Sequence, residues 1–588
     1  FTQLPKGDAD LEILDRYFAG KVPTKKNEYT GLLQGYNVIM LCAESYSPYL
    51  ISPELTPTLY KLSTNGFVFE NFYCSFPNTT TAGEYAFCMG LMPDMYRSKV
   101  ASSFDASSTN YLPYCMGNVF GKQALPAYAY HDYYGSFYNR NITHANMGYD
   151  FKAVSFGLDI PLSWPASDKD MIDASTQDFI ASDDPFCVYY MTFSGHYEYD
   201  WSNAMSSKNR HRVQDLDYSE EVKAYLACNL ELEDALTSLL AQLEAAGQAD
   251  NTIIVLTADH YPYGLQEEQY NELAGKAVDT TFGKFQSSFI CYVPGMEPVA
   301  VPDYCSTIDI LPTLLNLLGV DYDSRLLTGR DVLAHEDNLA ILSDHSYITD
   351  SFRYDAATAT AIANDGGEVD AKTVAKYCDY VSEVFEVSTA ILDTDYYSHV
   401  FGVSGGNREQ AYMFEDVHNI YMSNGISFVC EKGYMTPDSD TVFGAERTSS
   451  VAEFIDCVYR IEGSPKVEVG SSVPADSEYP EAAAWAISNG LLTNEELSQT
   501  LNYKFTAILI CRYMQLQGNL SAQQLGGNDA LYSLFPALTQ EEVDALLWCN
   551  SEEIINGNEG ESIFAQAETV VVRKQVASYI MRICSFES

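Results

Sequence analysis

From about residue 36 onwards, short apolar runs alternate with stretches in which apolar residues recur every three or four positions. The runs have the length of strands, and the spaced stretches have the period of amphipathic helices. The predicted strands are NVIMLCA (37–43), FVFENFY (67–73), AYAYH (127–131), FCVYYMTF (186–193), NTIIVLT (251–257) and SSFICYV (287–293). The predicted helices include TPTLYKLSTNG (56–66), the long run at 219–247 and STIDILPTLLNLLG (306–319). This alternation predicts an α/β fold with a mostly parallel central sheet and helices on both faces.

The pattern changes after about residue 355, where DAATATAIANDGGEVDAKT is small, polar and acidic. Further on, SVAEFIDCVYRIEGSP, KFTAILICRYMQLQGN and RKQVASYIMRICSF share one helical apolar pattern. Their aligned residues Tyr459, Tyr513 and Met581 are 54 and 68 positions apart. Spacings of this size are typical of an array of small helical modules. The alternative is three unrelated amphipathic helices.

The chain is acidic and has the composition of a folded protein. Its 588 residues exceed one compact core, and 46% are hydrophobic, with 44 tyrosines. Against 33 Lys and Arg stand 81 Asp and Glu, a formal charge of −48. Such a chain repels nucleic acid and anionic membrane surfaces, so nucleic acid is excluded as a partner. An anionic substrate would need a metal ion and a few local cations to overcome this field.

The sequence contains no run of about 18 apolar residues, the length needed for a membrane span. It begins at Phe1 without a signal-peptide pattern. We therefore expect a mature or trimmed fragment, with a membrane anchor upstream.

Fourteen cysteines do not make a disulfide scaffold in a chain of this length. Cys42, Cys187 and Cys291 lie in predicted strands and are expected to be buried thiols. Cys74 and Cys88 flank the stretch NTTTAGEYAF and are the pair that could be bridged.

Side chains that bind metals follow three of the predicted strands. Glu44 follows the first, Asp259 and His260 follow the fifth, and a threonine run (79–81) follows the second after a short loop. Sites in such sheets form at the carboxyl ends of strands. These residue types suit Mn²⁺, Mg²⁺ or Zn²⁺, and a metal near a hydroxyl would make that hydroxyl a nucleophile. The alternatives are a helix cap with a packed histidine and a surface glutamate.

The threonine run also has a structural interpretation. Threonine is a good N-cap, and a helix that starts near Thr81 would point its first amide groups at a bound phosphate. We therefore predict that Thr81 caps the helix and that another threonine carries the chemistry.

The order of the motifs resembles the sulfatase-like branch of the alkaline phosphatase superfamily, above all lipoteichoic acid synthases and related phosphoglycerol transferases. NVIMLCAES, TTAGEYAF, LTADHYPYG and STIDILPTLLNLLG carry this resemblance over about residues 36–350. It implies one divalent metal, Mn²⁺ before Mg²⁺ or Zn²⁺, with Glu44, Thr80, Asp259 and His260 as ligands. It also implies that Thr80, four residues before Glu84, is the nucleophile.

The same resemblance implies a substrate pocket. His131, Tyr138 and Arg140 in YHDYYGSFYNRN would bind a glycerol phosphate head group, and His196 in MTFSGHYEY would bind substrate and transfer a proton. Tyr138 stands where these synthases typically carry tryptophan. The serine usually found beyond the Asp-His pair is not evident in DHYPYGLQ.

Other activities occur in the same superfamily. Sulfatases need Cys or Ser in a C/S-x-P-x-R motif, and the nearest match, SFPNT at 75–79, lacks the arginine. Phosphoethanolamine transfer, phosphodiester or phosphate hydrolysis, and a wall-anchored binding protein with a vestigial catalytic fold stay open. The remaining histidines are expected to be structural or solvated: His144, His211, His335, His345, His399 and His418.

The C-terminal segments resemble S-layer homology repeats. Only Arg573-Lys574-Gln575 comes near the docking motif of that family, so wall-polysaccharide binding and a structural or partner-binding role both stay open. The predicted organisation is an N-terminal extracellular linker (1–35), a catalytic domain (36–355), a connecting segment (356–407) and three repeats (408–588).

The combined resemblance implies metal-dependent transfer of glycerol phosphate through a phosphothreonine. The donor would be a phosphatidylglycerol-like anionic lipid, and the acceptor a teichoic acid-like polymer or a glycan. The expected location is the cell surface of a Gram-positive-type bacterium.

Overall fold

The computed structural model describes most of the chain, and its residues form two compact units, Phe1–Glu409 and Gln410–Ser588. The described residues are 9–94, 103–154, 156–336, 338–403, 414, 416–417, 425–426, 428–430, 432–439, 441–470, 473–474, 477–521, 525, 535–552, 554–555 and 563–586. His418 lies outside them.

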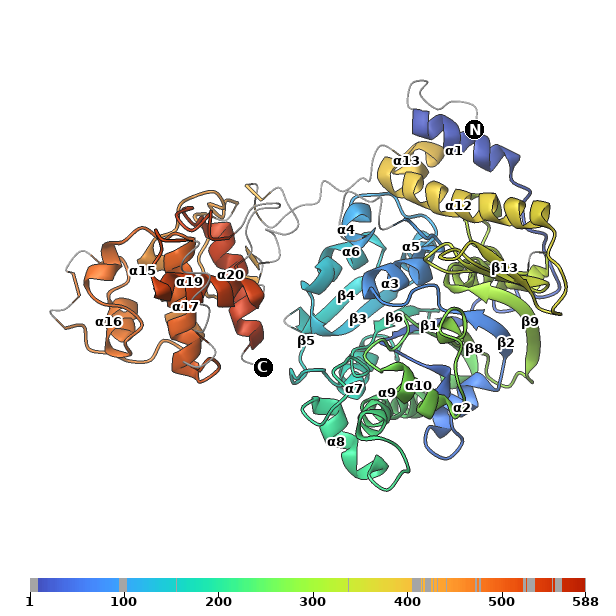
Figure 1. Cartoon of the computed structure of the whole chain (residues 1–588), viewed down its shortest axis with the longest axis horizontal. Helices are drawn as coiled ribbons and strands as arrows, with labels where there is room; N and C mark the ends of the chain where they lie inside the picture. The colour runs from blue at the N-terminus through green and yellow to red at the C-terminus, as the bar shows by residue number, and fades with distance from the viewer. Residues whose placement is uncertain are drawn as a thin grey trace. The chain divides into compact units, whose positions relative to one another are not determined.

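A nine-stranded sheet runs through the first unit (Figure 1). Its spatial order is β5-β4-β3-β6-β1-β7-β8-β2-β9, and every pairing is parallel except those of β8. The strands are β1 (Asn37–Ala43), β2 (Phe67–Tyr73), β3 (Ala127–Tyr134), β4 (Asp150–Val154), β5 (Gly157–Leu158), β6 (Cys187–Met191), β7 (Thr252–Ala258), β8 (Ile290–Tyr292) and β9 (Val299–Ser306). The predicted α/β fold is confirmed.

Helices cover both faces of this sheet (Figure 1). Alternate residues of β1 enter two different cores, Met40 the core on one face of the sheet and Leu41 the core on the other. Burial on both faces explains why this strand is apolar throughout. The helices of the first unit are α1 (Ala9–Gly20), α2 (Pro57–Ser63), α3 (Thr80–Met89), α4 (Ser103–Ser107), α5 (Met116–Lys122), α6 (Arg140–Asn146), α7 (Asp168–Ser175), α8 (Ala204–Val213), α9 (Glu220–Ala245), α10 (Glu267–Ala274), α11 (Ile310–Leu317), α12 (Ala371–Thr394) and α13 (Tyr396–Phe401). No helix among the described residues is long and apolar enough to cross a membrane.

A second, antiparallel sheet follows the first, with the order β10-β11-β12-β13. Its strands are β10 (Leu339–Ile341), β11 (Tyr347–Thr349), β12 (Phe352–Asp355) and β13 (Thr360–Ala363). The segment predicted as a connection thus contains β13, α12 and α13. Val384 and Phe385 of α12 are buried against this sheet. The segment therefore contains an amphipathic helix, which its acidic composition did not indicate. The predicted domain boundaries stay predictions.

The threonine run folds differently from the prediction that Thr81 caps a helix. Helix α3 begins at Thr80, its N-cap residue is Thr79, and no side chain bonds to the free amides of its first turn. Thr79 has φ of 78° and turns its hydroxyl toward Asn78, so its side chain cannot cap. Thr81 is buried inside the helix.

Cys74 and Cys88 are both buried free thiols, so the considered bridge is absent. The Cys74 thiol contacts the carbonyl oxygen of Asp259 at 3.4 Å instead, because α3 turns Cys88 into the core on the other side of the sheet.

The C-terminal unit is built of helices: α15 (Val451–Ile461), α16 (Pro480–Ser488), α17 (Tyr503–Gln517), α19 (Gln540–Ser551) and α20 (Arg573–Phe586). The three predicted amphipathic helices are confirmed as α15, α17 and α20. The chain just before each of them pairs with the other two, through the bridges Ser450↔Thr500, Asn502↔Val570 and Thr448↔Val572. Three equivalent segments therefore close a triangle at the helix N-termini.

Candidate active site

The carboxyl ends of neighbouring strands bring three ligand-type residues together. Strands β1 and β7 pair in register up to Ala43 and Ala258, so the next residues, Glu44 and Asp259, lie side by side. Both are buried, as is His260. Ligand atoms of these three residues all lie within 4.8 Å of one another, which we call the Glu-Asp-His group.

Hydrogen bonds fix the orientation of the group. Backbone amides of Ser45 and His260 donate to Asp259 Oδ1 at 2.9 and 2.8 Å. His260 Nδ1 lies 3.0 Å from the carbonyl oxygen of Tyr261, so the proton belongs on Nδ1 and the Nε2 lone pair faces Asp259. Asp259 Oδ2, 3.2 Å away, accepts no hydrogen bond from any described residue.

This arrangement fits a divalent cation. Two lone-pair atoms, His260 Nε2 and Asp259 Oδ2, face each other in a buried place, with Glu44 Oε1 3.6 Å from the histidine. Burial, and then the charge of Asp259, raise the pKa of Glu44 well above its usual value. A cation would offset the repulsion between the carboxylates of Glu44 and Asp259 and would give Asp259 Oδ2 a partner. The O/N donor set suits Mn²⁺, Mg²⁺ or Zn²⁺. His260 is oriented as a ligand histidine is, with its Nδ1 hydrogen-bonded to the carbonyl oxygen of Tyr261.

Thr80 stands at the edge of this group. Its Oγ1 lies 3.4 Å from His260 Nε2, and the residue is half-buried, so a substrate can reach the hydroxyl. The position is the first of α3, where free amide groups and the helix dipole favour an anion. Gly83, one turn later, lets α3 approach the chain so closely that a Cβ would stand 1.8 Å from the carbonyl oxygen of Asp259.

His196 follows the turn at the end of β6. Its Nδ1 lies 2.6 Å from the carbonyl oxygen of Tyr197, which leaves the Nε2 lone pair free, and burial lowers the pKa of the imidazole. Gly195 packs so tightly that a Cβ would stand 2.2 Å from the carbonyl oxygen of Glu44. A pocket of about 270 Å³ opens beside His196, lined also by Trp164, Tyr197, Glu198, Ser202 and Asn203.

The predicted head-group residues have two different environments. His131 and Arg140 are each 1% exposed, and Arg140 Nη1 lies 3.2 Å from His131 Nε2. His131 Nδ1 lies 3.0 Å from the carbonyl oxygen of Met191, so Nε2 accepts from the guanidinium. Tyr138 is 42% exposed and lies over the guanidinium, 5.3 Å from ring centroid to Cζ. Tyr138 is therefore the member of this set that reaches solvent.

Glu84 organises this part of the site. Its carboxylate receives Arg140 Nη2 at 2.7 Å and Nε at 3.2 Å, and the hydroxyl of Tyr189 at 3.0 Å. His144 Nε2 lies 3.2 Å away, so this histidine is part of the buried network. The network joins α3, which carries Thr80, to α6 and β6.

We expect Glu84→Gln to lower the free energy of unfolding by about 3–5 kcal/mol, because it leaves Arg140 buried without its counter-charge. Burial alone would raise the pKa of Glu84, but Arg140 and His144 hold it well below the usual value. A lowered folded pKa stabilises the protein above the unfolded pKa of about 4.3, and this contribution is lost as pH falls below it. Denaturant titrations from pH 7 to 3 should therefore show a weaker acid dependence in the variant. Glu220→Gln, which removes an exposed ion pair with Lys223, is the control and should leave the free energy of unfolding nearly unchanged.

We also expect the protein to bind one divalent cation at the Glu-Asp-His group. At a free metal concentration 100 times the Kd, binding should stabilise the fold by about 2.7 kcal/mol, read as a rise in Tm. Asp259→Asn should remove this response. Asp303→Asn, in a different Asp-His pair at 2.6 Å from His335, should keep it. An unchanged metal response in Asp259→Asn would contradict the assignment of the site.

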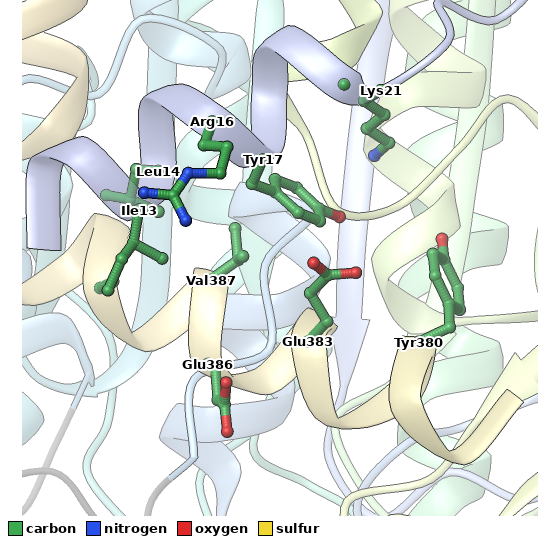
Figure 2. Close-up of a pocket in the computed structure, with 11 residues that line it drawn as sticks. Ile13, Leu14, Arg16, Tyr17, Lys21, Tyr380, Glu383, Glu386 and Val387 are labelled. Atoms are coloured by element: carbon green, nitrogen blue, oxygen red, sulfur yellow. The ribbon is translucent and has the colours of Figure 1, made fainter. Parts of the chain in front are cut away.

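A larger pocket lies elsewhere and shares no residue with this site. About 690 Å³ in volume, it lies between α1 and α12, where Figure 2 shows Tyr17 and Glu383. The proposed active site therefore does not lie in the larger of the two pockets described.

The structure thus brings together Glu44, Thr80, Asp259 and His260 as one group, and His131 with Arg140 as another. Sequence reasoning missed the partners of Glu84 and two buried acids, Asp132 and Asp168. Asp132 directly follows His131, and this adjacency was the one available signal.

Comparisons with known proteins show what this chain resembles. Residues 37–320 match the Sulfatase family model. A lipoteichoic acid synthase-like protein of Bacillus subtilis is 25% identical over 388 residues, 62% of this chain and 61% of the relative. The lipoteichoic acid synthase of Staphylococcus saprophyticus is 24% identical over 362 residues, 59% of this chain and 55% of the relative. The chain thus spans little more than half the length of these relatives.

The crystal structure of the lipoteichoic acid synthase LtaP from Listeria monocytogenes superimposes with a TM-score of 0.55 at 21% identity, over 65% of this chain and 98% of that one. The sheet and its helices match the alkaline phosphatase/sulfatase fold. Residues 37–320 are therefore similar to the Sulfatase family, and lipoteichoic acid synthases are among the relatives of the chain.

Proposed function

We propose that this protein transfers glycerol phosphate from a phosphatidylglycerol-like lipid to a hydroxyl of a cell-envelope polymer or glycan, through a covalent intermediate on Thr80. The observation that carries the proposal is the placement of the Thr80 hydroxyl, 3.4 Å from His260 Nε2 at the edge of the buried Glu-Asp-His group. The relatives named as lipoteichoic acid synthases support the same reaction class.

In the first step, Thr80 Oγ1 attacks the phosphorus of the lipid donor. A bond forms between Oγ1 and phosphorus, the bond from phosphorus to the lipid oxygen breaks, and the lipid alcohol leaves with a proton. The free amides at the start of α3 bind the phosphate oxygens. A divalent cation held by Glu44, Asp259 and His260, Mn²⁺ by preference, would lower the pKa of the threonine hydroxyl and offset the negative charge of this acidic chain.

In the second step, the acceptor hydroxyl attacks the phosphothreonine. His196 is the proposed base, because its Nε2 lone pair is free and burial favours the neutral imidazole. The oxygen–phosphorus bond to Thr80 breaks, and Oγ1 takes back a proton. The pocket beside His196 offers room for the acceptor.

The head group of the donor would meet Tyr138 first, because this residue is exposed while His131 and Arg140 are buried behind it. We keep all three as the proposed substrate-binding set. In this set Arg140 donates a hydrogen bond to His131, and the guanidinium of Arg140 lies against the ring of Tyr138. Tyr138 in place of tryptophan leaves the identity of the head group to experiment.

The C-terminal unit is proposed to consist of three S-layer homology-like repeats that bind cell-wall polysaccharide. The triangle of bridges before α15, α17 and α20 supports three equivalent modules. Arg573, the residue nearest the docking motif, is 2% exposed and donates to Glu453 at 2.7 Å. Any wall contact would therefore use other residues. An extracellular, membrane-proximal location on a Gram-positive-type cell is part of this proposal.

The test is to incubate the protein and Mn²⁺ with phosphatidylglycerol or phosphatidylethanolamine, with and without a glycolipid acceptor. Intact-mass spectrometry should show one glycerophosphoryl group per chain, and the acceptor should remove it with formation of a glycerophosphoryl product. Free glycerol phosphate as the only product would instead identify a hydrolase, and a phosphoethanolamine adduct the other transferase. No adduct and no product with either lipid would favour a vestigial catalytic fold.

A further inference from the structure

Two buried carboxyl groups lie beside the proposed active site. Asp132 follows His131 near the end of β3, and Asp168 is the first residue of α7. Both are 0% exposed, and they interact directly with each other. We call them the acid pair. No described Lys or Arg forms an ion pair with either one.

The two members have different partners. Asp168 Oδ1 accepts the backbone amides of Phe193 and Ser194, each at 2.8 Å, and Oδ2 accepts the Ser194 hydroxyl at 2.5 Å. Within the described part of the chain, no donor reaches either oxygen of Asp132. The nearest candidate, His131 Nδ1, is 3.7 Å away and faces the carbonyl oxygen of Met191.

This difference assigns the proton. Two buried carboxylates in contact cannot both be ionised without a cation, so one must be protonated. Asp168 has three donors and the N-terminus of α7, which favour its charged form. Burial, and then the charge of Asp168, raise the pKa of Asp132 well above its usual value. Asp132 therefore holds the proton, and its O–H can donate a hydrogen bond to Asp168.

The acid pair holds the chain that leads to His196. Asp168 binds the turn at 192–196, which we call the histidine turn, two residues before the imidazole. On the other side of this turn, Gly195 is in close contact with the carbonyl oxygen of Glu44. Asp168 is thus one of the groups that position His196, together with Asn203, whose Nδ2 donates to the carbonyl oxygen of His196 at 2.9 Å.

We propose that Asp168, with protonated Asp132 as its hydrogen-bond donor, is the positioning residue for His196 in the acceptor step. The inference rests on the proposed function for the role of His196. It predicts a division between the two steps of the reaction: formation of the adduct on Thr80 does not need the acid pair, whereas release of the adduct to the acceptor does.

The test compares Asp132→Asn, Asp168→Asn and Asp170→Asn in the full chain. Asparagine at 132 can donate an N–H where the protonated acid donates its O–H, so this variant should keep turnover within about threefold and leave Tm unchanged. Asparagine at 168 replaces the charged acceptor, and a misplaced base should lower turnover by about 100-fold. The Thr80 adduct should still form at the wild-type rate and then accumulate. Asp170, two residues along α7 and half-buried, is the matched control and should behave as wild type.

Two outcomes would overturn the inference. Loss of turnover in Asp132→Asn equal to that in Asp168→Asn would contradict the assigned proton. Equal slowing of adduct formation and adduct release in Asp168→Asn would mean a merely structural role. If Asp168→Asn does not fold, Asp132→Asn and Ser194→Ala replace it in the test. Ser194→Ala removes one donor to Asp168 and should slow adduct release more than adduct formation, whereas Asp132→Asn should change neither rate.

Failure of the proposed function would look different. The wild type would then form no adduct on Thr80, while the acid pair can still be tested without substrate. The imidazole NMR signal of His196, assigned by His196→Gln, should be unchanged in Asp132→Asn and shifted in Asp168→Asn. An unshifted signal in Asp168→Asn would overturn the inference on its own.

Discussion

Thr80→Ala should abolish the covalent adduct and reduce turnover to the level of buffer, because the half-buried Thr80 hydroxyl is the proposed nucleophile, whereas the buried Ser45 hydroxyl donates to Glu44 Oε1. Removing a catalytic nucleophile in other enzymes costs about 10⁶ in kcat, so the expected loss is far outside experimental error. Thr80→Ser keeps a hydroxyl on the same carbon and should retain an adduct. The measurement is intact mass after exposure to lipid donor, followed by peptide mapping.

The neighbouring threonines provide matched controls. Thr79→Ala and Thr81→Ala remove the same atoms from the adjacent positions, one exposed and one buried. We expect both variants to form the adduct, with Thr81→Ala losing some stability from its cavity. An adduct that persists in Thr80→Ala and disappears in Thr81→Ala would move the nucleophile by one residue.

Gly83→Ala should lower turnover by about 100-fold, because a methyl group would stand 1.8 Å from the carbonyl oxygen of Asp259. The backbone must move to relieve this overlap, and the helix that moves carries Thr80 while the strand end that moves carries a proposed metal ligand. The free energy of unfolding should fall by about 1–3 kcal/mol, the usual cost of overpacking. Metal affinity, measured by titration calorimetry, should fall with turnover.

Gly121→Ala is the control for this substitution. Gly121 is also a helical glycine, but no atom lies within 4 Å of its Cβ position. Alanine there should leave activity unchanged and raise stability by about 0.5–1 kcal/mol, from helix propensity. If Gly83→Ala behaves like this control, the close approach of α3 to Asp259 is not needed for activity.

The sequence predicted the buried half of the sheet well. Strands β1 and β2 have the predicted bounds. Strand β1 is buried on both faces and is therefore continuous in apolar residues, whereas β2 includes the exposed Glu70. Strand β9 was missed, since it lies at the edge of the sheet and contains Pro302 and Asp303. The antiparallel direction of β8 has no local signal, because an apolar run does not encode its orientation.

The site was predictable as far as its residues follow strands in the chain. Glu44 and Asp259 could be placed together from strand ends alone, and the resemblance supplied Thr80. The contacts of Glu84 could not be predicted from the sequence, because Arg140 and Tyr189 come from α6 and β6 and meet only in the folded core. The protonation of Asp132 could not be predicted from the sequence either, since it depends on which acid accepts hydrogen bonds from the amides of the histidine turn.

The parallel topology also governs when this site can form. Strand β1 is synthesised early, but its hydrogen-bonding partners are β6 at residues 187–191 and β7 at residues 252–258. Pairing between strands so far apart in the sequence is slow, and β1 stays unpaired until β6 and β7 have been synthesised. A nascent chain that ends before Asp259 holds Glu44 and Thr80 but no complete ligand set. Pairing of β7 with β1 therefore completes the proposed ligand set, so a nascent chain without β7 cannot form the proposed reactive centre.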